Sequence, residues 1–240
     1  LLPQVGQSAL QYAVGAIENR PVDKDEMKQM QTLLIDSIEQ GAFSITTGLS
    51  LSPSGYMSTD ELITLCKVLS KYSNVFYATH AREINDNGIE EAIKIGLDVG
   101  IPVQYSHIAL IDPDQFGKAA EILGIFEDAV TNGLDITYDV YPYTAGQGGL
   151  NQAIPAWAQS GNLYDYMNRL ADIDIRKKIR KEVEKGVLGT PSWDSWIIAN
   201  WPHQNAEQIV GKSVYEIAVD RGIDPAETVL QLEEESQGTV

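Results

Sequence analysis

Residues 22–143 alternate between two hydrophobic patterns. In VDKDEMKQMQTLLIDSIEQGA, apolar side chains recur every three or four residues, which is the period of an amphipathic helix. Asp23 and Glu26 have the spacing of a capping box at its start, and Gly41 follows as a stop signal. Helix patterns are also found in three further stretches, 58–72, 87–100 and 112–133.

Short apolar runs separate these helices. They are rich in β-branched and aromatic residues, as in NVFYATH and IPVQYSH, and are apolar enough for strands buried on both faces. The strands are expected to begin near Ala42, Asn74, Ile101 and Leu134. One strand and one helix in roughly 30 residues is the rhythm of a parallel sheet with helical crossovers. The pattern predicts an α/β protein, either a (β/α)8 barrel or an open doubly wound sheet. No G-x-G-x-x-G or P-loop motif follows a strand, which disfavours nucleotide-binding versions.

The pattern weakens after Tyr143. TAGQGGLNQAIPAWAQSGN is typical of a loop, and LYDYMNRLADIDIRKKIRKEVEKG of an amphipathic helical stretch. SWIIANW is a further strand candidate, and SVYEIAVDRG and DPAETVLQLEEE are predicted short helices. Because a barrel needs eight strands, we expect residues 1–240 to be one partial barrel domain, the later part without the first strands. A glycine-rich loop and helical insertion would cover about residues 144–192 of that domain.

Composition narrows the possible functions. The 240 residues are 43% hydrophobic, enough for a sizeable core, and the net charge of −17 disfavours binding to nucleic acids or anionic membranes. The single cysteine, Cys66, excludes an intramolecular disulfide and lies on the apolar stripe of its predicted helix, so we expect a buried structural thiol. No apolar run approaches the ~20 residues of a membrane span, and no secretory signal is visible. We therefore expect a cytoplasmic protein, although a chain that starts without methionine need not carry its true N-terminus.

Two of the three histidines end neighbouring predicted strands. In a parallel barrel, His80 and His107 would lie at the carboxyl ends of strands about 4.8 Å apart, where active-site groups gather. Each alone could be a hydrogen-bonded residue without chemical role, but the matching positions favour a shared metal or substrate site. Imidazole suits zinc, iron, nickel or cobalt, and a catalytic site usually has at least three protein ligands.

A third ligand is not evident from the pattern. Asp139 is a possible neighbour, but the alternation of side chains along a strand leaves open whether Asp139 or Tyr141 faces the barrel mouth. His203 follows a proline in a predicted loop, and we expect it to face solvent.

The ordered set GAFSITTGLSLSPSGYMSTDEL, YATHARE, PVQYSH and DITYDVYPYTAG resembles the N-acyl-D-amino-acid deacylases (D-aminoacylases) of the amidohydrolase superfamily. The resemblance runs from about Val5 to beyond Gly222. It implies a (β/α)8 barrel with a small β-domain, and metal-dependent hydrolysis of the amide of an N-acyl-D-amino acid or a related small amide. It also implies that His80 and His107 are metal ligands from the fifth and sixth strands, with zinc as the expected metal. The family's His-x-His pair, early cysteine and eighth-strand aspartate, the general base, have no counterpart in this chain, and we expect the aspartate beyond Val240.

The resemblance assigns roles to further residues. Tyr141, the first tyrosine of YPYTA, would donate to the developing oxyanion, and Tyr56, in PSGY, would contact the substrate. Both could instead be packing aromatics. Arg82, two residues after His80, could bind the substrate carboxylate or be a solvated loop charge.

The chain also departs from the family pattern. Ala109 stands where the family has a lysine that holds the substrate carboxylate, Gln147 where it has an assisting serine, and Gln7 where it has a histidine. These departures keep two alternatives open, a non-catalytic barrel of amidohydrolase type and a cyclic amidase or deaminase of the same superfamily. A third alternative is an open-sheet α/β binding protein in which the histidines have no chemical role. The sequence predicts a small-molecule substrate and leaves the oligomeric state open.

Overall fold

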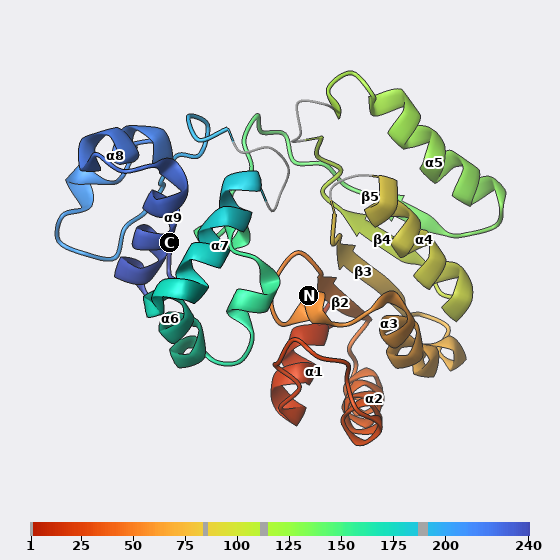
Figure 1. Ribbon diagram of the computed structural model, residues 1–240. Coiled ribbons are helices and arrows are strands. Elements are labelled where there is room, and N and C mark those ends of the chain that lie inside the picture. Colours follow the sequence, from red (N-terminus) through yellow and green to blue (C-terminus); the bar gives the residue numbers. More distant parts are fainter. Residues whose placement is uncertain (1, 84–85, 111–114, 187–191) are drawn as a thin grey trace. The chain divides into compact units, whose positions relative to one another are not determined.

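The computed structural model describes residues 2–83, 86–110, 115–186 and 192–240 (Figure 1). The chain divides into two compact units, residues 1–143 and 144–240. The α/β class and the parallel sheet expected from the sequence are confirmed. The assignment of residues 1–240 to one catalytic domain stays a prediction.

The first unit is built on a sheet of five parallel strands, each paired with its neighbours in the sequence. The strands are β1 (Gln4–Gly6), β2 (Ser44–Gly48), β3 (Phe76–His80), β4 (Val103–Ser106) and β5 (Ile136–Tyr138). The four predicted strands, β2 to β5, are confirmed, and each begins two residues after the predicted start. β1 lies outside the predicted strands because its three residues are too few to show a period of two.

The helices of the first unit are α1 (Gln7–Val14), α2 (Lys24–Glu39), α3 (Thr59–Cys66), α4 (Asp86–Val99) and α5 (Ala119–Thr131). Both predicted capping boxes form, and the one at Asp23 starts α2 while the one at Ser58 starts α3. α5 is shorter than the stretch 112–133 predicted as a helix. Gly117, with φ +86°, is incompatible with a helix just before Ala119, and residues 111–114 lie outside the described part. Helices α1 to α5 pack against one another in chain order, as Figure 1 shows.

The two faces of the sheet differ in character. One row of strand residues aligned by the pairing register is apolar and packs in the core with side chains of α2 to α5: Ile45, Tyr77, Val103 and Ile136. The next row projects from the opposite face and contributes nothing to that core: Thr46, Ala78, Gln104 and Thr137. The helices therefore cover the apolar face, while the other face carries small or polar side chains.

Close packing positions α4 against the sheet. A Cβ on Gly96 would come within 2.4 Å of Val103 Cγ2 and 2.9 Å of Leu134 Cδ1, so only glycine allows this approach. Cys66 lies fully inside the same core, where burial raises the pKa of its thiol to about 12. The expected structural role of this thiol agrees with that environment.

The second unit is mainly helical, with α6 (Leu163–Ala171), α7 (Ile173–Lys185), α8 (Val214–Arg221) and α9 (Pro225–Ser236). The helical stretch predicted over 163–186 is divided at Asp172, whose extended backbone and side chain start α7. SWIIANW contributes an isolated antiparallel bridge between Ile197 and Ser213, not a strand. The predicted proline start of α9 is confirmed at Pro225.

The second unit has its own hydrophobic core and one buried carboxyl group. Glu233 on α9 is fully inaccessible and accepts a hydrogen bond of 2.8 Å from the Tyr166 hydroxyl. Burial raises the pKa of Glu233 to about 7, so this carboxyl is easily protonated near neutral pH.

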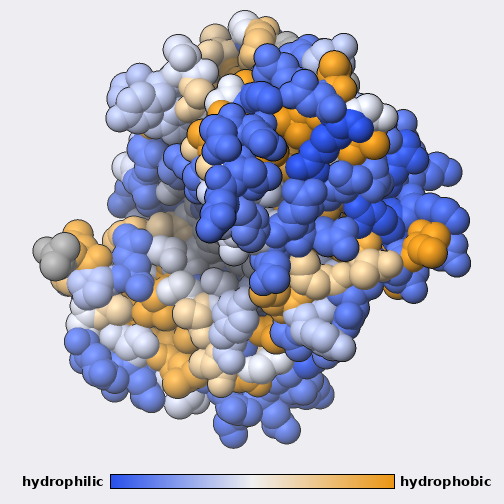
Figure 2. Space-filling model, turned by 90° about the vertical axis from the view of Figure 1, so that its left-hand side faces the viewer, coloured by the Kyte–Doolittle hydropathy of each residue, from blue (hydrophilic) through white to orange (hydrophobic). Residues whose placement is uncertain are grey.

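The surface is largely polar on the face drawn in Figure 2, where hydrophobic residues form separate patches. Among the described residues, no helix combines the length and the apolar character that a membrane crossing requires.

Candidate active site

The carboxyl ends of the strands bring the predicted site residues together in the first unit. His80 is the last residue of β3 and is aligned with Ser106, so His107 follows one residue beyond on the neighbouring strand. Tyr141 follows β5 by three residues, and Tyr56 lies in a 3₁₀ turn (η1, Ser54–Tyr56) after β2. The four residues thus lie at or just after the carboxyl ends of adjacent parallel strands, β2 to β5, where such folds place their chemistry.

The two imidazole rings are neighbours. The centroids of His80 and His107 lie 5.5 Å apart with an interplanar angle of 65°. Two imidazoles bound to one tetrahedral ion, each with a nitrogen about 2.1 Å from it, have centroids roughly 5 Å apart. The spacing of the rings therefore fits two ligands of one ion. Among the described residues, no set of three or more histidine, cysteine or acidic side chains is gathered to hold a metal.

The electrostatic environment keeps His80 neutral. Its pKa is lowered, first because burial disfavours the charged imidazolium and second because His107 lies close by. Neutral imidazole is the form that binds metal ions, so no proton has to be displaced from His80 near neutral pH.

Asp139 holds the backbone of His107. His107 has a φ of +59°, in the left-handed region that non-glycine residues rarely adopt. Its amide donates to Asp139 Oδ1 at 2.9 Å, and the next amide, of Ile108, donates to the Asp139 carbonyl at 2.9 Å. The Asp139 carboxylate also accepts from Gln104 Nε2 at 3.0 Å and lies 3.8 Å from His107 Nδ1, too far for a hydrogen bond. In this structure the Asp139 carboxylate stabilises the left-handed backbone conformation of His107.

Tyr141 also faces this cluster. Its ring centroid lies 5.9 Å from that of His107 at an interplanar angle of 52°, and its side chain is half-buried. Regular strand structure ends at Tyr138, so the alternation of side chains along β5 does not determine which way Asp139 and Tyr141 face. Both residues approach His107, one at its backbone and one at its ring.

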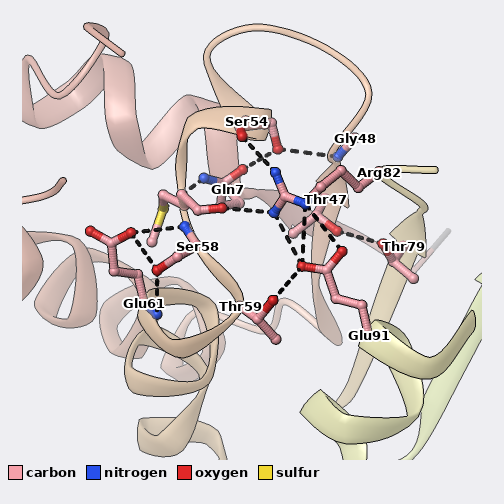
Figure 3. Close-up of polar contacts among 12 residues, drawn as sticks. Gln7, Thr47, Gly48, Ser54, Ser58, Thr59, Glu61, Thr79, Arg82 and Glu91 are labelled. Atoms are coloured by element: carbon pink, nitrogen blue, oxygen red, sulfur yellow. Dashed lines mark hydrogen bonds and ion pairs between the residues drawn. The ribbon is translucent and has the colours of Figure 1, made fainter. Parts of the chain in front are cut away.

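Arg82 is bound to the segment that carries Tyr56 (Figure 3). Its guanidinium donates to the carbonyl oxygens of Gly55 at 2.6 Å and Met57 at 2.7 Å. It also pairs with Glu91 of α4, with an Nη2–Oε1 distance of 3.1 Å. The guanidinium is thus already engaged within the protein. The binding of a substrate carboxylate by Arg82 stays a prediction.

The positions that depart from the family pattern have different environments. Gln7 is fully buried, donates to Gln11 Oε1 at 2.7 Å and Met57 Sδ at 2.8 Å, and accepts from the Ser54 hydroxyl. Ala109 lies two residues beyond His107 and is half-buried. Gln147 belongs to the second unit, as does His203, which is exposed as expected and bonds the Glu235 carbonyl at 2.8 Å.

Sequence reasoning missed the residues that support the site. Glu91 lies within a helix with no feature that distinguishes it from the adjacent Glu90. The backbone-binding role of Asp139 depends on a left-handed residue that no sequence signal marks, since His107 is not glycine. The TYDVYPY motif did identify Asp139 as a neighbour of the histidines, although as a possible ligand.

Comparisons with known proteins agree on one group of enzymes. No protein-family model matches the chain. It is 33% identical over 151 residues to the D-aminoacylase of Alcaligenes xylosoxydans xylosoxydans, covering 62% of this chain and 31% of that protein. It is 31% identical over 148 residues to the N-acyl-D-aspartate deacylase of the same organism, covering 60% of this chain and 30% of that one.

Solved structures give the same result. A D-aminoacylase structure that addresses the functional role of the binuclear metal center of that enzyme superposes with a TM-score of 0.67 at 27% identity, over 94% of this chain and 40% of that chain. The chain spans about a third of the length of the curated relatives it matches. The resemblance predicted from the sequence is thereby confirmed.

Proposed function

We propose that this chain, a homologue of the D-aminoacylases, is part of a metal-dependent amidohydrolase that cleaves the amide of N-acyl-D-amino acids. The observation that carries the proposal is the adjacency of the His80 and His107 rings, 5.5 Å apart at the carboxyl edge of the sheet. The Tyr141 ring lies beside that of His107, and Tyr56 lies in the loop after β2, at the same edge.

A (β/α)8 barrel is the architecture that best suits the first unit. Helices α2 to α5 pack on one face of the sheet, and the other face carries Thr46, Gln104 and Thr137 in one row. A doubly wound sheet needs helices on both faces, whereas a barrel directs its second face to the interior. We propose that β1 to β5 are consecutive strands of such a barrel and that residues 144–192 are an insertion in one catalytic domain.

His80 and His107 would hold a divalent metal, for which zinc is the best candidate because neutral imidazole is a preferred zinc ligand. The bound metal would lower the pKa of a water molecule and polarise the scissile carbonyl. Tyr141, beside His107, would donate its hydroxyl proton in a hydrogen bond to the oxygen on which negative charge develops. Tyr56 would contact the substrate from the loop after β2.

The test uses the full-length protein purified without chelator. We expect His80→Ala and His107→Ala each to reduce bound metal, measured by elemental analysis, and to abolish hydrolysis of N-acyl-D-amino acids. His203→Ala is the matched control, because this exposed histidine lies in the second unit. Metal content that is unchanged in both variants would refute the metal site, and a metal-loaded wild type that hydrolyses no N-acyl-D-amino acid would refute the substrate assignment.

A further inference from the structure

Arg82 binds both backbone carbonyls that flank Tyr56. Nη1 donates to the Gly55 oxygen at 2.6 Å, and Nη2 donates to the Met57 oxygen at 2.7 Å. The planar guanidinium has donors at fixed angles, so binding two carbonyls defines the course of the three-residue segment between them. The peptide groups that join Gly55 to Tyr56 and Met57 to Ser58 are therefore both held by one side chain.

Glu91 fixes the guanidinium in turn. Its carboxylate accepts from Arg82 Nε at 3.2 Å and from Nη2 at 3.1 Å, and it also accepts from the Thr59 hydroxyl at 2.8 Å (Figure 3). The Arg82 side chain is 29% exposed and that of Glu91 is 11% exposed, so the pair is largely shielded from water. A substrate carboxylate at Arg82 would have to compete with a carboxylate that is already in place.

The same segment is held from its other side. The Ser54 hydroxyl donates to Gln7 Oε1, and Gln7 Nε2 donates to Met57 Sδ at 2.8 Å. No larger residue fits at Gly55, because a Cβ there would lie 2.5 Å from the Leu49 carbonyl oxygen. The Leu49 amide donates to the His80 carbonyl at 3.0 Å, so the loop is also tied to the strand end that carries the imidazole.

We propose that Arg82 is a positioning residue: together with Glu91 it fixes residues 54–57 so that Tyr56 is held at a set distance from the histidine pair. The inference rests on the proposed function only where Tyr56 is taken to contact the substrate. In this proposal Arg82 acts by fixing the loop and does not bind the substrate carboxylate directly.

The first test is independent of activity. In the full-length protein, hydrogen exchange of the Gly55, Tyr56 and Met57 amides should become at least tenfold faster in Arg82→Gln. Arg20→Gln is the matched control, because Arg20 also pairs with a carboxylate, Glu26, and a backbone carbonyl in the same unit. Unchanged exchange in a folded Arg82→Gln protein would overturn the proposal.

A second pair of variants guards against unfolding of Arg82→Gln. Glu91→Gln keeps the arginine but removes the charge that anchors it, and we expect faster exchange of the same amides. Glu90→Gln, at the adjacent exposed position, should leave exchange as in the wild type. Equal exchange in the two glutamate variants would count against the role of Glu91 and thus against the clamp.

Kinetics then distinguish positioning from substrate binding. An N-acyl-D-amino acid and its α-carboxamide should lose the same factor in kcat/KM, at least tenfold, in Arg82→Gln, because the loop serves both substrates. Tyr56→Phe should add little to that loss in the double variant. A loss confined to the carboxylate substrate would assign Arg82 to carboxylate binding and overturn the inference. If the wild type cleaves neither substrate, the proposed function fails, while the exchange experiment still decides whether the clamp exists.

Discussion

Replacement of Asp139 by alanine should weaken metal binding without removing a ligand. The carboxylate accepts a 2.9 Å hydrogen bond from the amide of His107, which has a φ of +59°. Alanine removes this acceptor and also the 3.0 Å bond from Gln104 Nε2. The backbone of His107 would then be free to return to an unstrained conformation and to carry the ring away from His80.

The size of the effect follows from two contributions. A hydrogen bond to a charged acceptor contributes about 1.5–3 kcal/mol, and the lower end applies because the Asp139 side chain is 53% exposed. The left-handed conformation itself costs a non-glycine residue about 1–2 kcal/mol, which the carboxylate no longer offsets. If metal binding has to supply about 1–2 kcal/mol of this free energy to restore the conformation of His107, the affinity for metal falls about 5–30-fold.

The assay is a zinc titration of full-length protein against a competing chelator. Asp139→Asn keeps an oxygen acceptor for the His107 amide, so we expect it to retain most of the affinity that Asp139→Ala loses. Asp135→Ala, at an exposed position before β5, is the control and should bind as the wild type does. Equal, large losses in the alanine and asparagine variants would show that Asp139 acts as a ligand or through its charge, and would refute its role as a support for the His107 backbone.

Three further predictions concern stability and reactivity. Gly96→Ala should destabilise the first unit by about 1–3 kcal/mol through overpacking against Val103, whereas Gly124→Ala, with open space around its Cβ, should stabilise α5 by up to about 1 kcal/mol; urea unfolding followed by circular dichroism measures both. Burial raises the pKa of Glu233 to about 7, so its protonated form favours the folded state. The contribution of Glu233 to the stability of the second unit should be complete below about pH 4.5 and should fall by on the order of 3 kcal/mol as pH rises through 7. Tryptophan fluorescence reports on that unit, because all four tryptophans lie there, and Glu233→Gln should remove this part of the pH dependence. Cys66, fully buried and with a pKa near 12, should react with a thiol reagent only after unfolding; rapid labelling of the folded protein would contradict the described core.

Local sequence patterns predicted the strands that carry the two histidines and the starts of two helices. The apolar runs before His80 and His107 identified two strands, and the strand ends placed the two rings side by side. The capping boxes at Asp23 and Ser58 located two helix starts to the residue, because a cap involves only four consecutive positions.

Contacts between distant residues were beyond such reasoning. The hydrogen bond between Gln7 and Ser54 joins positions 47 residues apart, and nothing in the sequence indicates that these two residues are partners. The Arg82–Glu91 pair spans only nine residues, but Arg82 also donates to Gly55 and Met57, and these contacts with the loop after β2 have no local signal in the sequence. The predicted strand at 134–143 was longer than β5. The Asp139 amide still donates to the Tyr105 carbonyl of β4, but the Asp139 carbonyl accepts from Ile108, past the left-handed residue His107, and the regular ladder ends at Tyr138.

Arg82 lies two residues after His80 and binds the loop after β2, so it connects the loop that carries Tyr56 to the end of β3. Insertions or deletions between β2 and α3 would reshape the space around Tyr56. The imidazoles would keep their spacing, because His80 ends β3 and His107 follows the paired strand β4. Substrate range and metal chemistry could therefore diversify separately during evolution, and an engineer could exchange this one loop to alter acyl preference without redesigning the histidine pair.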